Sequence, residues 1–146
     1  MGFDLHFQII EPELQPTLGN FSFQLNNSLR VKGKYKVANL WLKIFLTPKN
    51  SHPIKRTQGT EFFFILGSNF SSVADLQMQI MEYIEDASNQ VKTTQSKNPL
   101  IPDDERFERA ELIQFNIINQ FSIEVWVKIY NRAGTFLSVL IPYTSA

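Results

Sequence analysis

The stretch IEVWVKIYNRAGTFLSVLIP, residues 123–142, reads as two β-strands joined by a tight turn. The first strand alternates between apolar and polar residues, which predicts a half-buried strand. We expect inward side chains at Phe121, Ile123, Val125, Val127 and Ile129, and outward side chains at Ser122, Glu124, Trp126, Lys128 and Tyr130. NRAG, residues 131–134, suits a turn that ends in glycine. The second strand is apolar on both faces, so it needs a cover or a neighbouring strand.

A third strand is expected directly before this hairpin. RAELIQFNI, residues 109–117, is expected to place Ile113, Phe115 and Ile117 on one face, with a short turn at Asn119 and Gln120. The three strands form an antiparallel meander whose apolar face packs on a helix.

Two helices are predicted before the meander. The first has one apolar face, made by Val37, Leu40, Trp41, Ile44 and Phe45, and Pro48 helps to end it. The second runs from about Ser72 to Thr94, with Ser71 or Ser72 as the N-cap and Asp75 in its first turn. Its apolar positions are Val73, Leu76, Ile80, Ile84, Ala87 and Val91. Met78 and Met81 are expected to fill the core beside them.

The remaining segments are less regular. Residues 3–10 and 21–25 alternate like strands, residues 26–28 form a turn, and an extended segment resumes after it up to Gly33. EFFFILG, residues 61–67, fits either a buried strand or a helical turn, because periodicity cannot separate the two. The predicted fold class is α+β, with helices packed on a C-terminal three-stranded antiparallel meander. Residues 1–33 form an extended strand and loop arm, and residues 34–146 form a single domain.

Composition excludes several classes of protein. The chain has 146 residues, of which 43% are hydrophobic and 19% charged, as in a globular domain with a real core. It has no Cys and two His, which are far apart, so neither disulfides nor a metal site is expected. No stretch approaches the roughly 18 apolar residues of a membrane span. We therefore expect no cofactor, no metal and no membrane partner.

The charges are segregated along the chain. No acidic residue occurs between Leu14 and Thr60, a stretch that carries Arg30, Lys32, Lys34, Lys36, Lys43, Lys49, Lys55 and Arg56. The rest is net acidic, with Asp103, Asp104, Glu105, Glu108 and Glu111 close together. Two interpretations are about equal: the two regions face each other within one fold, or one of them is a protein interface. A nucleic-acid surface ranks well below both, because no binding motif accompanies the charge, so we expect no nucleic-acid partner.

No catalytic motif is present. The sequence lacks a glycine-rich phosphate loop, a serine elbow and metal-spaced histidines. Paired carboxylates can hydrolyse sugars, but one of them needs a pKa raised by burial. Here the carboxylates stand beside Arg106 and Arg109, which favour their ionised form. The protein is therefore not expected to be an enzyme.

The order of several short motifs resembles a known family. FLTPKNS (45–51) is followed by QGTEFFFILGSN (58–69), a long helix, IPDDERFERAEL (101–112), and a meander with NRAGT (131–135) and VLIP (139–142). This order resembles the baseplate wedge, or sheath-initiator, proteins of contractile-tailed phages, a family sometimes labelled lysozyme-like. The resemblance covers about three quarters of the chain and leaves the first thirty residues unmatched.

The resemblance implies structural work in a virion. Family members sit in the tail baseplate, in a six-fold hetero-oligomeric ring around the tube, and are assembled in the host cytoplasm. The implied partners are the tail sheath protein, other wedge proteins, and tube or hub proteins. Some members have a Glu-Pro-Arg corner that contacts other wedge proteins. Here the corner reads Asp104-Glu105-Arg106 without the proline, so the implied contact residues are Glu105, Arg106 and Arg109.

The resemblance also implies that the first sheath ring attaches by strand exchange with the C-terminal sheet. The expected residues are Thr135, Phe136, Leu137, Ser138, Val139, Leu140 and Ile141, a run with neither charge nor proline. Monomeric proteins usually protect such an edge with one or the other. Lys32, Lys34, Lys36, Lys55 and Arg56 are candidates for a basic interface. The alternatives are a peptidoglycan-cleaving tail enzyme, a nucleic-acid-binding module that uses residues 14–60, and a small adaptor unrelated to phage tails.

Overall fold

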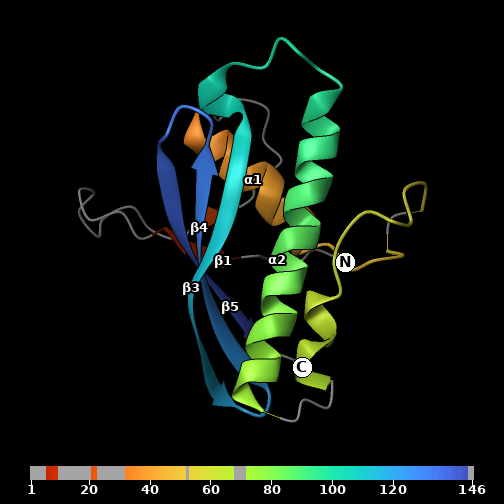
Figure 1. The fold of residues 1–146 in the computed structure, drawn as a ribbon. Coiled ribbons are helices and arrows are strands. Elements are labelled where there is room, and N and C mark those ends of the chain that lie inside the picture. The colour runs from red at the N-terminus through yellow and green to blue at the C-terminus, as the bar shows by residue number, and fades with distance from the viewer. Residues whose placement is uncertain (1–5, 10–20, 23–31, 52, 68–71, 145–146) are drawn as a thin grey trace.

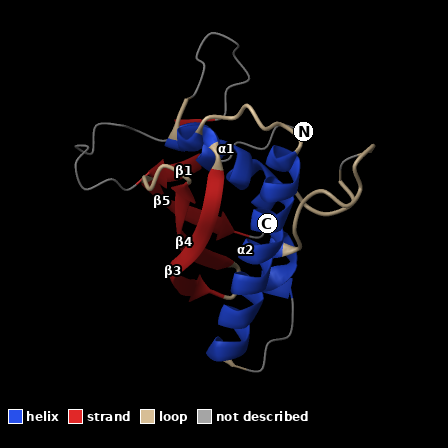
Figure 2. Cartoon of the chain, turned by 45° about the horizontal axis from the view of Figure 1, so that its top comes forward, coloured by secondary structure: helices blue, strands red, loops and turns tan. Residues whose placement is uncertain are grey.

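The structure is a computed structural model that describes residues 6–9, 21–22, 32–51, 53–67 and 72–144. Two helices lie side by side on one face of an antiparallel sheet (Figures 1 and 2). The helices are α1 (Lys34–Phe45) and α2 (Val73–Ser96). The strands are β1 (His6–Ile9), β2 (Phe21–Ser22), β3 (Phe107–Asn119), β4 (Ser122–Asn131) and β5 (Phe136–Thr144). The α+β class and the C-terminal meander are confirmed.

The sheet has the order β2-β1-β5-β4-β3. β4 and β5 pair without interruption from Ser122 opposite Thr144 to Tyr130 opposite Phe136. β1 pairs with the other side of β5, where Ile9 lies opposite Val139 and Gln8 opposite Leu140. Strand exchange through residues 135–141 would require a free edge on β5, and the structure shows that this edge is already paired at Val139 and Leu140. The arm supplies the neighbour that the apolar last strand needs.

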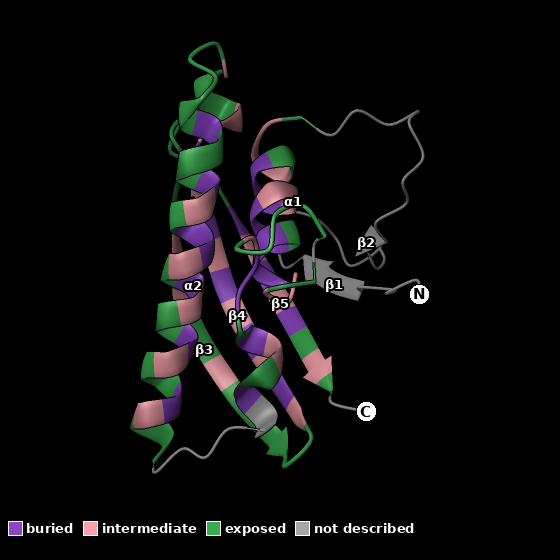
Figure 3. Cartoon of the chain, turned by 90° about the vertical axis from the view of Figure 1, so that its right-hand side faces the viewer, coloured by how far each residue is buried: buried purple, intermediate pink, exposed green. Residues whose placement is uncertain are grey.

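The two predicted helices are confirmed, and each packs its buried residues against the core. α2 begins after Ser72, whose side chain accepts a hydrogen bond from the Asp75 backbone N–H at 3.2 Å. Its buried side faces α1 and the sheet, while its outer side is exposed (Figure 3). Met78 and Met81 lie on that outer side with exposures of 70% and 52%, so the prediction that they fill the core is wrong. Val73 is also exposed.

Aromatic side chains hold α1 against the rest of the core. Trp41 stacks on Phe45 with ring centroids 4.7 Å apart, and Phe45 meets Phe62 at 4.6 Å. Phe62 belongs to η1, a 3-10 helix at Phe62–Gly67, which settles the choice between strand and helical turn left open by the sequence. The Trp41 indole N–H donates to Ser88 Oγ on α2 at 3.1 Å.

The meander follows its predicted alternation except where β3 is irregular. Ile123, Val125, Val127 and Ile129 are buried as expected. Phe121 lies in the turn before β4 and is 54% exposed, so its predicted inward position is wrong. β3 shifts register between Leu112 and Gln114, which leaves Ile113 unpaired and 44% exposed. Phe115 and Ile117 share the helix side of the sheet, but the bulge removes Ile113 from that face.

The predicted turn at residues 26–28 and the extended segment after it lie outside the described residues, as does Arg30. No helix in the described part of the chain is long and apolar enough to cross a membrane.

Candidate functional site

The corner before the sheet is built from three separate contacts. Its residues form η2 (Asp103–Glu105), a short 3-10 helix. Glu105 receives a hydrogen bond from Lys36 on α1 at 2.8 Å. Arg106 donates to the Asn98 carbonyl at 3.0 Å and so holds the chain after α2. Arg109 lies on β3, bonds to Glu111 at 2.8 Å and stacks its guanidinium on the Tyr130 ring at 4.0 Å. The three predicted contact residues therefore do not form one cluster.

Glu105 also completes the start of α1. Gly33 stands at the N-cap without a capping side chain, and the first turn of α1 contains no acidic residue. The Lys36 hydrogen bond holds the pKa of the Glu105 carboxyl below its ordinary value, and the Gly33 backbone N–H adds to this effect. A carboxylate from the corner thus supplies the negative charge that stabilises a helix N-terminus. At this contact the basic and acidic regions face each other within one fold.

We expect Lys36→Met to raise the pKa of Glu105 more than Lys32→Met does, because Lys32 acts only through weaker charge attraction. Since folding lowers this pKa, the pair stabilises the protein above the unfolded pKa of glutamate. That stabilisation is lost as the pH falls through the lower, folded pKa. NMR titration of the Glu105 carboxyl measures the shift, and unfolding at several pH values measures the stability. Equal shifts in the two variants would contradict the assignment.

The turn between β4 and β5 is braced on the same corner. Asn131 is 2% exposed, and its side chain donates to the Asp104 carbonyl at 2.8 Å and accepts from the Thr135 N–H at 2.9 Å. On the other side of the corner, Gln95 accepts from the Phe107 N–H at 2.7 Å and donates to the Glu105 carbonyl at 2.9 Å. Sequence reasoning missed both amides. In the sequence, each of these amides is only a polar residue beside apolar positions. That pattern does not reveal a hydrogen-bond partner far along the chain.

The predicted basic interface divides into two groups. Lys32, Lys34 and Lys36 lie before and in the first turn of α1, whereas Lys55 and Arg56 lie in the loop that leaves its other end. Lys36 is engaged by Glu105. This separation weakens the case for one continuous basic surface among these residues.

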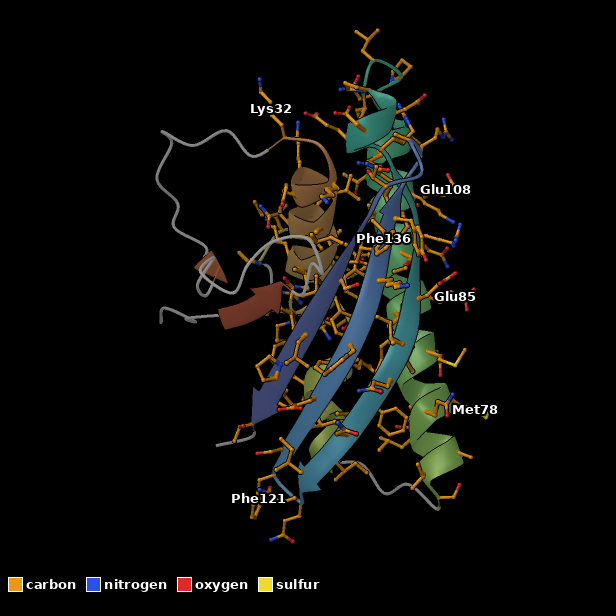
Figure 4. All side chains as sticks on the ribbon, turned by 90° about the vertical axis from the view of Figure 1, so that its left-hand side faces the viewer. Lys32, Met78, Glu85, Glu108, Phe121 and Phe136 are labelled. Atoms are coloured by element: carbon orange, nitrogen blue, oxygen red, sulfur yellow. The ribbon has the colours of Figure 1, made fainter. Side chains whose placement is uncertain are left out.

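The predicted exchange segment is divided between the turn and the strand. Thr135 belongs to the turn, and β5 begins at Phe136 and continues past Ile141 to Thr144. Leu137, Val139 and Ile141 are buried in the core. Phe136 and the half-buried Ser138 and Leu140 lie on the opposite face of the sheet, which no described helix covers (Figure 4). This segment combines a core face, an open face and an edge held by β1.

The carboxylates do not match a sugar-cleaving pair. A general acid needs a raised pKa, whereas that of Glu105 is lowered. Glu111 bonds to Arg109, and Glu108 lies 3.9 Å from Arg132. Within the described residues, no group of three or more His, Cys, Asp or Glu is placed to hold a metal ion.

Comparisons with protein-family models, with curated proteins and with solved structures find no match to this chain.

Proposed function

We propose that this protein is a structural component of a contractile-tail baseplate that joins the inner baseplate to the tail sheath. In this proposal it initiates sheath assembly by taking a strand of the sheath protein onto its own sheet. Other wedge proteins and tube or hub proteins are the remaining partners, in a six-fold assembly within the virion. The motif order in residues 31–142 motivates the family, and the second edge of β5 carries the mechanism.

That edge supports strand exchange because it already holds an extended segment from the distant arm. The recorded register covers Val139 and Leu140, so β1 is a short neighbour. A partner strand that pairs along more of β5 would form more main-chain hydrogen bonds than β1 does. The proposal therefore replaces β1 by a sheath strand.

The two edges of the meander differ in regularity. β5 pairs with β4 without a register shift, whereas β3 carries three shifts along its length. Bulges twist an edge and are a common protection against unwanted pairing. β5 can therefore pair with an exchanged strand along most of its length, whereas β3 offers only short regular stretches, such as Gln114 to Ile117.

In this proposal, the corner mainly holds the local structure in place and makes few direct contacts with a partner. Glu105 and Arg106 are engaged within the chain, and Arg109 presents its stacked guanidinium on the open face. A wedge partner would meet the exposed surface of η2 and Arg109.

Site-specific cross-linking tests strand exchange, because the chain has no natural cysteine. Deleting β5 would not be informative, since Leu137, Val139 and Ile141 belong to the core. We expect Ser138→Cys, labelled with a photo-cross-linker, to capture the sheath subunit of the same tail. Glu111→Cys on β3 is the matched control on the other outer strand of the meander, because both Glu111 and Ser138 lie opposite Lys128 of β4, and it should capture several-fold less. Equal capture from both positions, or none from Ser138→Cys, would contradict the proposed site.

A further inference from the structure

A slot lies between α2 and the outer edge of β3. It has a volume of about 460 Å³ and is lined by Val73 and Gln77 of α2 and by residues 112–117 of β3. The face of a strand would contribute alternate residues to such a lining, whereas here six consecutive residues contribute. The slot therefore runs along the main chain at the strand edge. A smaller hollow of about 290 Å³ shares Leu112 and continues toward Lys92 and Arg109.

α2 is placed to cover one more strand. Opposite views show that its N-terminal half diverges from β3 and lies outside the strand edge (Figures 3 and 4). This overhang explains why Val73 is 61% exposed although it continues the apolar face of the helix. β3 is the last strand of the described sheet, so its edge has no strand partner there.

The edge at the slot is uncharged, and between two bulges it is regular. Register shifts occur next to Ile113 and Ile118, but Gln114 to Ile117 pair with β4 without interruption. Alternate residues of this segment therefore point backbone N–H and C=O groups outward in the regular order of an antiparallel strand. No charged residue occurs from Leu112 to Ile123. Strand edges that stay unpaired usually carry charges, prolines or bulges. Bulges flank this stretch, but from Gln114 to Ile117 it has neither a bulge nor a charge.

We propose that the slot binds an extended segment of a partner protein, which adds to β3 as a further strand beneath α2. Main-chain groups at the edge require an extended backbone, and the uncharged lining selects a segment without charges over about six residues. In the bound segment, the side chains beside Phe115 and Ile117 would face α2 and should be apolar. Those beside Gln114 and Asn116 would face the open side of the sheet and should be polar.

A second copy of the chain does not suit this slot. Antiparallel pairing of two β3 strands needs a twofold axis perpendicular to the sheet, which places both helices on the same side. The overhanging half of each α2 would then occupy space above the other copy's sheet, where η1 and the core already lie (Figure 3). A single extended segment avoids this overlap. The inference is independent of the proposed function, which uses the opposite side of the meander.

A capped peptide with the sequence NFSFQLN, copied from residues 20–26, is a suitable probe because it is uncharged and alternates. We expect it to shift the backbone amide signals of residues 112–117 in the full-length protein in a saturable manner. The same peptide with alternate backbone N–H groups methylated should not bind, because it cannot complete the edge hydrogen bonds. Shifts at Val139 and Leu140 instead, or equal binding of the methylated peptide, would overturn the proposal.

Matched variants locate the site. Ile113→Lys places a charge at the slot and should weaken peptide binding by at least about tenfold. Met78→Lys makes the same change on the outer side of α2, outside the slot, and should leave binding unchanged. Unfolding midpoints show whether both variants keep the fold. Equal loss of binding in two folded variants would contradict the slot, as would no loss in Ile113→Lys.

Discussion

Trp41→Ala should be the most destabilising single substitution in the helical layer, lowering the free energy of unfolding by about 3–5 kcal/mol. Trp41 is fully buried, stacks on Phe45 and donates its indole N–H to Ser88. Alanine removes most of the side chain that joins α1 to α2, and the surrounding core cannot close completely over the cavity. Denaturant unfolding of both proteins measures the difference.

Two further variants separate the causes of this loss. Trp41→Phe keeps a ring but loses the hydrogen bond and part of the volume. Its free energy of unfolding should therefore lie between those of the wild type and Trp41→Ala. Met78→Ala removes an exposed side chain and should change stability by less than about 0.5 kcal/mol. A loss below about 1 kcal/mol for Trp41→Ala would show that α1 contributes little to the cooperative fold.

The helices and the meander were predictable because their signals are local. Val37, Trp41 and Phe45 recur with the helical period, and Ser72 offers a capping oxygen at the start of α2. The alternation from Ile123 to Ile129 fixes the inward face of β4 in the same way. In each case, neighbours within a few residues determine the geometry.

The residues whose burial was predicted wrongly depend on geometry that the sequence does not encode locally. Val73 follows the apolar pattern of α2, but this half of the helix overhangs β3 and leaves Val73 exposed. Met78 is exposed because it lies on the outer side of the helix. Ile113 continues an alternation that a register shift interrupts. A bulge or an overhang follows from how whole elements pack, so periodicity alone could not predict either feature.

The site depends even more on long-range contacts. Lys36 and Glu105 are 69 residues apart in the sequence. Each was predicted to contact a partner protein, but in the structure they form a hydrogen bond with each other. β1 reaches the edge of β5 across almost the whole chain. Charge segregation correctly suggested that two regions could face each other, but it could not name the pair. Val73 and Gln77 were not predicted as a binding wall, because the slot exists only where two elements diverge.

Gly59→Ala should destabilise the protein by more than a positive φ angle alone explains. Gly59 has φ +113°, and an added Cβ would lie 2.1 Å from the Thr47 carbonyl oxygen, a rigid backbone atom. The backbone conformation costs about 1–2 kcal/mol, and the overlap adds about 1–3 kcal/mol. Relieving this overlap would move the backbone at Gly59. That movement would also strain the Gln90 side chain, which bonds to both the N–H and the carbonyl of Gly59 at 2.9 and 2.8 Å.

Gly134→Ala is the matched control for this prediction. Gly134 also has a positive φ, +88°, but its added Cβ would meet no atom within 4 Å. The loss of stability in Gly134→Ala should therefore stay near the conformational cost of about 1–2 kcal/mol. Denaturant unfolding of the two variants isolates the overlap, and equal losses would show that the segment around Thr47 moves aside. A larger loss at Gly59 would instead show that the contacts of Gly59 with Thr47 and Gln90 hold the two ends of the loop that carries Lys55 and Arg56.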